Sequence, residues 1–296
     1  MRHHLAVFGP AIGARELKAE FPDASWWECE TIAWRFRHDL RRLVHSCTML
    51  SCTWTTPGTV WAADVWQPAQ PIEGIYGYVL DVRDLGSGCI IESMPLERCT
   101  AQAVSATIER LYATYGAPLV LKTDNGSEFT GDGAPDLHRR WGVQQLLSPP
   151  YLPSYNGACE AGHGSIRYRA EMLARRDGCP GQWTLNHLEG GRCWANDLTS
   201  QEGGVTHGDQ FAHRAPISQE QRDQFVRIVQ LEWSQRWHDL SIAAEKQRRT
   251  IVLTNVQATV SRAAISAALR DLGYLTTRSV PLRQQIPYAR ASDISQ

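Results

Sequence analysis

The sequence predicts an α/β fold centred on a five-stranded sheet, with helical regions before and after it. Three strand-like segments follow one another between residues 59 and 94, separated by turns that contain proline or glycine, as in an antiparallel meander. Beyond residue 100, helical periodicity alternates with short apolar runs, which gives the order βββαβαβα. The part after Gly181 again has mainly helical periodicity.

Two helices are predicted near the N-terminus. The first covers residues 14–21 and ends at Pro22, because proline cannot continue a helix. The second opens at Ser25, with Glu28 three residues later in the spacing of a capping box. The second helix carries a basic cluster, namely Arg35, Arg37, Arg41 and Arg42. This cluster suits contact with a DNA backbone and equally an ordinary solvated helix face.

The central elements follow in chain order. Strands are predicted at residues 59–66, 75–83 and 89–94, and a helix at residues 101–115. The apolar run at residues 118–121 predicts a buried strand that ends in Lys122-Thr123-Asp124. The alternation is completed by a short helix at 135–141, a strand at 143–147 and a helix that starts near Asn156.

The last third of the chain is predicted to contain long helices. One covers residues 218–249 and another covers residues 261–272, where Gly273 takes the position that follows a helix C-terminus. Tyr274 and Leu275 are expected to form a small hairpin or winged element with Val280.

Composition excludes several classes of protein. No run approaches the ~20 apolar residues that span a bilayer, and the first residues lack the apolar stretch of a secretory signal. We therefore expect a cytoplasmic protein with no membrane partner. The eight cysteines contain no Cys-x-x-Cys pair, which excludes a zinc ribbon or a disulfide framework as the basis of the fold.

Charge is distributed unevenly along the chain. From residue 246 onward there are eight basic and two acidic residues, which gives this region a net charge of +6. The whole chain has a net charge of −1, so the first 245 residues have a net charge of −7. A basic C-terminal region on an acidic body suits an enzyme whose carboxylates bind metal while other segments hold phosphates. A solvated tail would have the same composition.

Three acidic residues stand at the ends of predicted elements. Asp64 is on the first strand of the sheet, Asp124 follows the fourth, and Glu160 is in the first turn of the last helix of the alternation. Ligands of open sheets bind beyond the carboxyl ends of the strands, where Asp124 lies. Three carboxylates can hold two magnesium ions that assist an in-line displacement at phosphorus. The pattern predicts a catalytic metal site.

These residues lie in motifs that resemble the catalytic core of retroviral integrases and bacterial insertion-sequence transposases. The motifs are Trp61-Ala62-Ala63-Asp64, Lys122-Thr123-Asp124-Asn125-Gly126, and Asn156-Gly157-Ala158-Cys159-Glu160 after Ser148-Pro149-Pro150-Tyr151. Thirty-five residues separate Asp124 from Glu160, as in that family. The resemblance covers residues 59–176.

The resemblance implies a ribonuclease H-like fold with a DDE site. Asp64 would bridge two Mg²⁺ ions, for which Mn²⁺ could substitute, while Asp124 and Glu160 would each hold one. A DNA 3′-hydroxyl or a water molecule would attack a phosphodiester. The His-His-Cys-Cys zinc module that precedes the retroviral core has no counterpart here. The expected organisation is residues 1–56 as a remnant helix-turn-helix segment, 57–178 as the catalytic core, 179–249 as a helical extension and 250–296 as a basic region that contacts DNA.

Four neighbours of the acidic trio are candidates for contact with DNA. Lys122 precedes Asp124 on the same strand face, and His163 and Arg167 follow Glu160 at helical spacings. Asn156 could steady the loop before Glu160. The alternatives are a packed histidine, a solvated arginine and an ordinary turn asparagine.

The predicted function is that of a transposase or integrase, which cleaves DNA and transfers strands during transposition of a mobile element. Transposon ends and target DNA are the expected partners, and a homo-oligomer is expected because two ends must be handled together. The sequence leaves open whether an accessory ATPase takes part. The alternatives are a transposase-derived DNA-binding protein without catalysis and a ribonuclease H-like nuclease.

Overall fold

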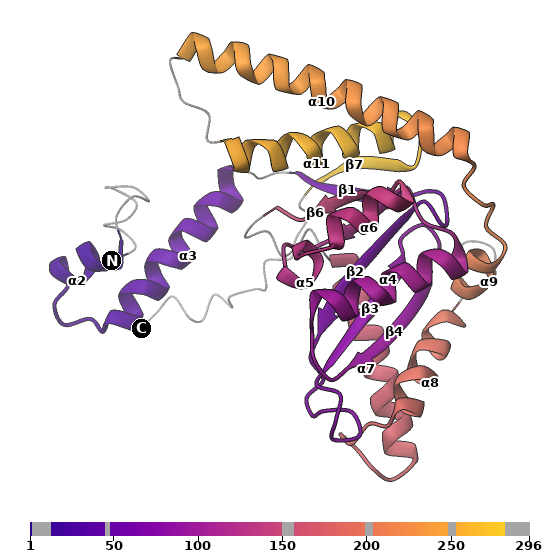
Figure 1. Cartoon of the computed structure of the whole chain (residues 1–296). Coiled ribbons are helices and arrows are strands. Elements are labelled where there is room, and N and C mark those ends of the chain that lie inside the picture. The colour runs from indigo at the N-terminus through magenta and orange to yellow at the C-terminus, as the bar shows by residue number, and fades with distance from the viewer. Residues whose placement is uncertain (2–12, 45–47, 150–156, 199–203, 248–252, 282–296) are drawn as a thin grey trace. The chain divides into compact units, whose positions relative to one another are not determined.

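The chain divides into two compact units. The computed structural model describes residues 1, 13–44, 48–149, 157–198, 204–247 and 253–281 (Figure 1). The larger unit spans Thr53–Thr276, and the smaller one combines Met1–Cys52 with Thr277–Gln296. No helix in these described ranges is long and apolar enough to cross a membrane.

The larger unit is built on a five-stranded mixed sheet, which confirms the predicted fold class. Its strands lie in the order β4-β3-β2-β5-β6. The first three strands pair antiparallel as a meander, whereas β5 and β6 continue the sheet parallel to β2. Their bounds are β2 Val60–Trp66, β3 Tyr78–Asp84, β4 Ile90–Leu96, β5 Val120–Thr123 and β6 Gln144–Leu147.

Helices connect the parallel strands, because parallel neighbours need a crossover. Helix α4 (Ala101–Tyr115) leads to β5, and α5 (Ser127–Thr130) and α6 (Ala134–Trp141) lead to β6. The Thr100 side chain caps α4 by accepting a hydrogen bond from Ala103 N. Helix α6 ends where Gly142 adopts a left-handed backbone with φ of 63°, which glycine allows without strain. The predicted bounds of α4 agree with the structure.

Alternate side chains of strand β2 pack into hydrophobic cores on opposite faces of the sheet. Trp61 and Ala63 pack under α4, together with Leu111 of that helix. Val60 and Ala62 point to the opposite face, where they pack with residues of α10 (Gln219–Gln247) and α11 (Leu253–Asp271). The predicted long helix at 218–249 matches α10, whereas α11 begins eight residues before the predicted start at 261.

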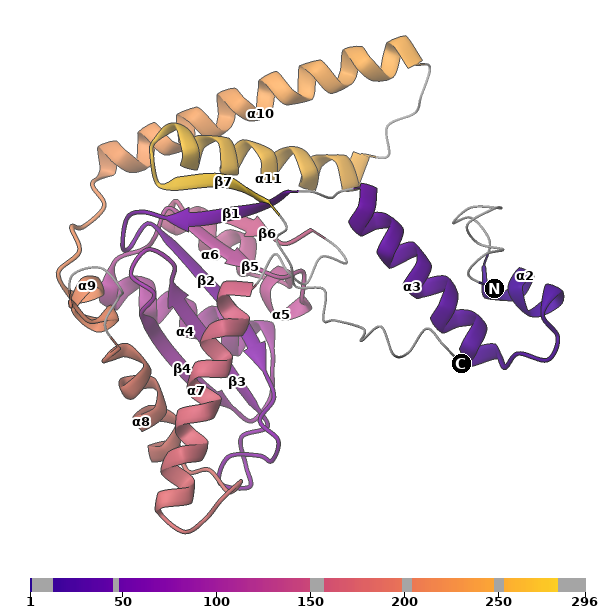
Figure 2. The ribbon, with the colours of Figure 1, turned by 180° about the vertical axis from the view of Figure 1, so that it is seen from behind.

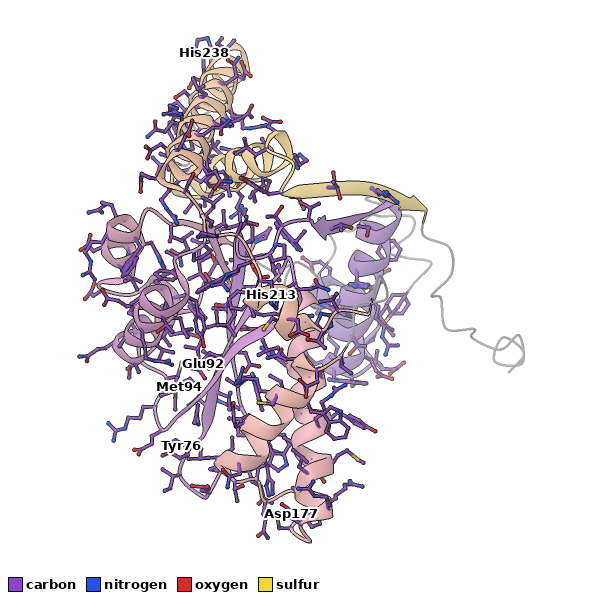
Figure 3. All side chains as sticks on the ribbon, turned by 90° about the vertical axis from the view of Figure 1, so that its right-hand side faces the viewer. Tyr76, Glu92, Met94, Asp177, His213 and His238 are labelled. Atoms are coloured by element: carbon purple, nitrogen blue, oxygen red, sulfur yellow. The ribbon has the colours of Figure 1, made fainter. Side chains whose placement is uncertain are left out.

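Helices α7 (Gly157–Arg176) and α8 (Leu185–Asn196) cover the rest of that opposite face. From behind, α7 crosses in front of β2 and β3 while α4 lies beyond the sheet (Figure 2). The two helices pack on each other. At the turn between them, Asp177 lies 3.1 Å from His187 Nε2 (Figure 3). A last short helix, α9 (His207–Ala212), places Phe211 in the core beneath α4.

Helix α8 also closes the edge of the sheet. The side chain of Asn196 accepts a hydrogen bond from Ile90 N at 2.8 Å and donates one to Ile90 O at 2.9 Å. Arg192 donates to the same carbonyl at 3.1 Å. The Asn196 amide therefore pairs with edge strand β4 as the backbone of another strand would.

The smaller unit contains α2 (Ala14–Glu20) and α3 (Trp26–Val44). The predicted capping box is present, since Ser25 N donates to Glu28 Oε2 at 2.7 Å and Glu28 N donates to Ser25 Oγ at 3.2 Å. Leu17, Cys29 and Ala33 are buried between the two helices.

One strand pair was not predicted. Strand β1 (Thr48–Trp54) pairs with β7 (Leu275–Pro281) as a two-stranded sheet. The predicted hairpin between Tyr274 and Val280 is wrong, because residues 275–281 form one continuous strand whose partner is β1.

Candidate active site

Asp64 and Asp124 lie at the carboxyl ends of neighbouring parallel strands. The register pairs Trp61 with Leu121 and Ala62 with Lys122. Two residues further along each strand, this register places Asp64 opposite Asp124, which directly follows β5. Parallel strands bring both carboxyl ends to the same edge of the sheet. The structure thus brings these two predicted site residues together from positions sixty residues apart in the sequence.

The backbone orients both carboxylates. Asp64 Oδ1 accepts a hydrogen bond from Val65 N at 2.9 Å, and Asp124 Oδ1 accepts one from Gly126 N at 2.9 Å. A hydrogen bond from a backbone N–H to an ionised carboxylate is stronger than a hydrogen bond between two neutral groups. One oxygen of each group therefore has a fixed direction.

The loop that carries Asp124 is anchored to the end of β6. Asn125 Nδ2 donates to Ser148 O at 2.7 Å. In return, Ser148 N and Ser148 Oγ donate to Thr123 O at 2.9 and 3.0 Å. These three hydrogen bonds on either side of Asp124 limit its movement relative to the sheet.

Glu160 belongs to the first turn of α7, which packs against β2 and β3. Its side chain lies outside the described residues, as does all of Asn156. Within the described part of the chain, no three His, Cys, Asp or Glu side chains form a group that could hold a metal ion. Glu160, the third member of the predicted trio, is not among those described side chains.

His163 lies one turn after Glu160 and faces the interior. Its Nδ1 is 3.9 Å from Asp64 Oδ2, and its Nε2 is 3.5 Å from Asp81 Oδ2. The residue is only 7% exposed. This burial does not support the expected contact with DNA and places the ring between two carboxylates instead.

Asp81 is a site neighbour that the sequence analysis missed. It pairs with Asp64 across β2 and β3, is 5% exposed, and accepts a hydrogen bond from Trp66 Nε1 at 2.7 Å. Burial raises the pKa of Asp81 to about 7, and the nearby Asp64 carboxylate adds to the shift. A carboxylate between Leu80 and Val82 of an apolar strand was the signal that could have identified it.

The pKa of His163 moves in the opposite direction. Burial lowers it to about 4, with further contributions from the positive charges of Arg167 and Arg83. The His163 ring is therefore uncharged at neutral pH, while burial favours the protonated form of Asp81.

Lys122 and Arg167 occupy different environments. Lys122 is 4% exposed on β5, so its burial does not support the expected contact with DNA phosphates. Arg167 is exposed. Its guanidinium lies 4.4 Å from the centre of the Trp66 ring and donates to Gln67 O at 3.3 Å. A cation stacked on tryptophan keeps its charge available to an approaching phosphate.

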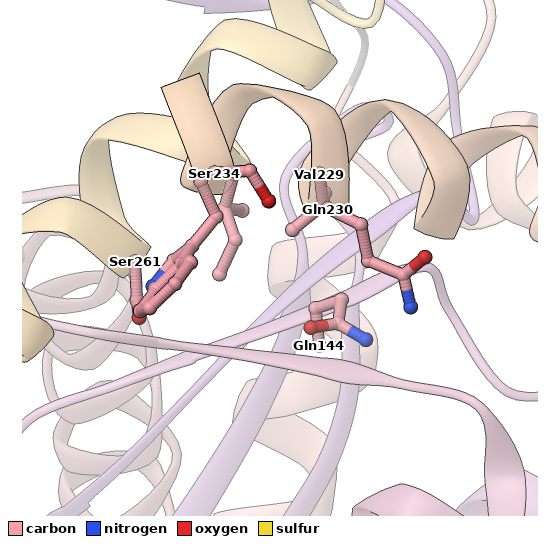
Figure 4. Close-up of a pocket in the computed structure, with 7 residues that line it drawn as sticks. Gln144, Val229, Gln230, Ser234 and Ser261 are labelled. Atoms are coloured by element: carbon pink, nitrogen blue, oxygen red, sulfur yellow. The ribbon is translucent and has the colours of Figure 1, made fainter. Parts of the chain in front are cut away.

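A hollow of about 250 Å³ lies away from the strand ends, between α10, α11 and β6 (Figure 4). Its lining contains no titratable side chain and consists of Gln144, Val229, Gln230, Trp233, Ser234, Ser261 and Ile265. The hollow offers no acid, base or metal ligand, so the strand ends remain the candidate site.

Comparison with known proteins relates the core to retroviral proteins. No family model matches the chain. A stretch of 130 residues, 44% of this chain, is 30% identical to the Pol polyprotein of Radiation murine leukemia virus (strain Kaplan). The matched stretch spans only 22% of that polyprotein.

Two solved structures are also similar. The cryo-EM structure of the simian T-cell lymphotropic virus intasome in complex with PP2A regulatory subunit B56 gamma matches with a TM-score of 0.50 and 17% identity. That match covers 74% of this chain and 76% of the other. The crystal structure of the BIV integrase catalytic core domain gives a TM-score of 0.43 at 21% identity, covering 52% of this chain and 94% of the other. The sheet is that of a ribonuclease H-like fold.

Proposed function

The chain carries an integrase-like core. On this premise we propose a DNA transposase or integrase that cleaves and joins DNA strands in an active site formed by Asp64, Asp124 and Glu160. The arrangement of Asp64 and Asp124 at adjacent strand ends is the observation that carries this proposal. In this account the partners are DNA ends and target DNA, and the enzyme works as a homo-oligomer.

The residues present fit a divalent metal site. Asp64 and Asp124 offer carboxylate oxygens, which hard cations such as Mg²⁺ prefer, and a backbone N–H fixes one oxygen of each. When bound, two such ions activate the attacking oxygen and stabilise the leaving oxygen of an in-line displacement. Asp64, on the central strand of the sheet, would hold the ions together with Asp124. Glu160 would complete the set from α7.

The surrounding residues have separate tasks. The buried ring of His163 stands against Asp64 and keeps that carboxylate from turning inward. The exposed Arg167 guanidinium offers a positive charge for a phosphate of the bound strand. Trp66 holds Arg167 in place through ring stacking and holds Asp81 through its indole N–H.

A strand-transfer assay tests the proposal. Wild type and Asp124→Asn would be compared with magnesium or manganese on duplexes taken from the DNA that flanks the coding sequence. Joined products from wild type alone are expected. Asp132→Asn, a change of an exposed aspartate in the next loop, is the matched control and should join strands at the wild-type rate.

The products also separate the alternatives. Nicked strands without joining would indicate a ribonuclease H-like nuclease. DNA binding by both proteins without nicking or joining would indicate a transposase-derived DNA-binding protein. Equal joining by wild type and Asp124→Asn would remove Asp124 from the site.

A further inference from the structure

Helix α3 exposes three large aromatic side chains. Trp26 is 50% exposed, Trp27 71% and Trp34 59%. Soluble monomers rarely leave several large apolar side chains together on the surface, and such patches usually mark a binding surface. Tryptophan is also the residue type most enriched among the anchors of protein interfaces.

Two of these residues form one ridge on the helix. Trp27 and Trp34 are seven residues apart, so at about 100° per residue they lie on the same face. The buried Cys29 and Ala33, which pack on α2, lie on the other side of the helix. His38 extends the ridge, because its ring stacks on Trp34 with centroids 5.0 Å apart and planes 18° apart. The Trp27 and Trp34 ridge is therefore not part of the core between α2 and α3.

The two halves of α3 carry opposite charge. The first half contains Glu28 and Glu30 and no basic residue, whereas the sequence of the second half contains four arginines and a single aspartate. The arginines are Arg35, Arg37, Arg41 and Arg42; the side chains of the last three lie outside the described residues. A partner that matches this helix must have the reverse order of charge.

We propose that α3 pairs antiparallel with α3 of a second copy of this chain, around a two-fold axis at Trp34. An antiparallel copy has the required reverse order, because the acidic half of each helix then faces the basic half of the other. Two-fold interfaces use the same patch on both subunits, which requires this kind of self-complementarity. DNA fits less well, since the acidic first half of the ridge would repel phosphates.

The register follows from the position of the axis. Trp34 is next to the midpoint of α3, so pairing around it uses the full helix. Trp34 then meets Trp34 of the second copy, and Glu30 faces the position of His38. Trp27 faces the position of Arg41, where a guanidinium over an indole ring is a favourable pair. This interface goes beyond the proposed function, which requires no particular contact between copies.

Cross-linking tests the axis directly and does not depend on catalysis. In full-length chains with Cys47, Cys52, Cys159 and Cys193 changed to serine, Arg35→Cys should give a covalent dimer with a short bismaleimide reagent, because Arg35 is exposed next to the axis and Trp34 is retained. Glu20→Cys on α2 is the matched control, because that residue is also exposed but lies off the ridge. Monomer from the Arg35→Cys chain, or equal dimer from both chains, would overturn the proposal.

Sedimentation of Trp34→Ala provides the second measurement. Removal of a central interface tryptophan should raise the dimer Kd by about tenfold or more. Trp194→Ala, which changes an exposed tryptophan of α8, should leave the dimer Kd unchanged. A lower Tm with an unchanged dimer Kd would show that the ridge packs on its own chain. A loss of DNA affinity with an unchanged dimer Kd would show a DNA surface, and either result overturns the proposal.

Discussion

Two pairs of side chains meet at the carboxyl end of β2, and they are held in place differently. The strand-end pair, Asp64 and Asp124, is oriented by backbone N–H groups. The interior pair, Asp81 and His163, is buried and depends on side chains, since Trp66 holds Asp81 and the two rings of His163 and Trp66 lie 6.1 Å apart. The strand-end pair is thus oriented by backbone groups that do not titrate, whereas the interior pair consists of two groups that do.

The largest effect is expected at the strand-end pair and its helical partner. Asp64→Asn and Glu160→Gln should each lower strand transfer by roughly a thousandfold or more, because an amide cannot replace an anionic ligand of a catalytic metal. Circular dichroism melting should show an unchanged fold. Retained activity in either variant would remove that residue from the site.

The second prediction concerns the interior pair and pH. For Asp81 the unfolded pKa is 3.8 and the folded pKa is about 7, so its contribution to stability decreases as pH rises between these values. For His163 the unfolded pKa is 6.5 and the folded pKa is about 4, so its contribution increases as pH rises through that range. The change is roughly 4 kcal/mol for Asp81 and roughly 3 kcal/mol for His163, and the two nearly cancel between about pH 4 and 6.5.

Single variants should expose the two opposing contributions. Relative to wild type, the free energy of unfolding of His163→Gln should fall as pH rises from 4 to 6.5. That of Asp81→Asn should rise between pH 4 and 7. Urea unfolding at several pH values measures both. If the free energy of unfolding of wild type, His163→Gln and Asp81→Asn changed with pH in parallel, the interior pair would not titrate as the burial of its members implies.

The smallest effect is expected at the rim of the site. Arg167→Ala should weaken DNA binding by a few fold at low salt and reduce the salt slope by about 1, since one phosphate contact is lost. Fluorescence anisotropy across a salt series measures this. Arg176→Ala, at the far end of α7, is the matched control and should bind DNA like wild type. Equal slopes for wild type and Arg167→Ala would exclude the phosphate contact.

Local patterns predicted the elements of the core well. The helical face of residues 101–115 and the capping box at Ser25 depend on neighbours within a few positions, and both are present as predicted. Strand β1 was missed because its partner is β7, more than two hundred residues later, and such pairing leaves no local periodicity. The hairpin prediction for residues 274–280 failed for the same reason.

For the candidate site, too, the local signals were read correctly and the features that depend on tertiary packing were not. Asp64 and Asp124 could be selected from motif and strand position, since the carboxyl ends of parallel strands share one edge of a sheet. The burial of His163 could not, because it depends on how α7 packs against β2 and β3. The burial of Lys122 could not either, because it depends on the place of β5 between β2 and β6 in the sheet. Asp81 was missed because the pairing of β2 with β3 places it beside Asp64, although its carboxylate stands out in an apolar strand.

The hydrogen bonds of Asn196 to edge strand β4 also bear on how the chain can be divided and produced. The contact joins residues 106 positions apart, so β4 leaves the ribosome long before α8. An uncovered strand edge is a template for association with other chains. A fragment that stops at residue 178 retains β4 and lacks α8. Such a fragment would carry an open edge and self-associate, so α8 belongs in any expressed version of the core.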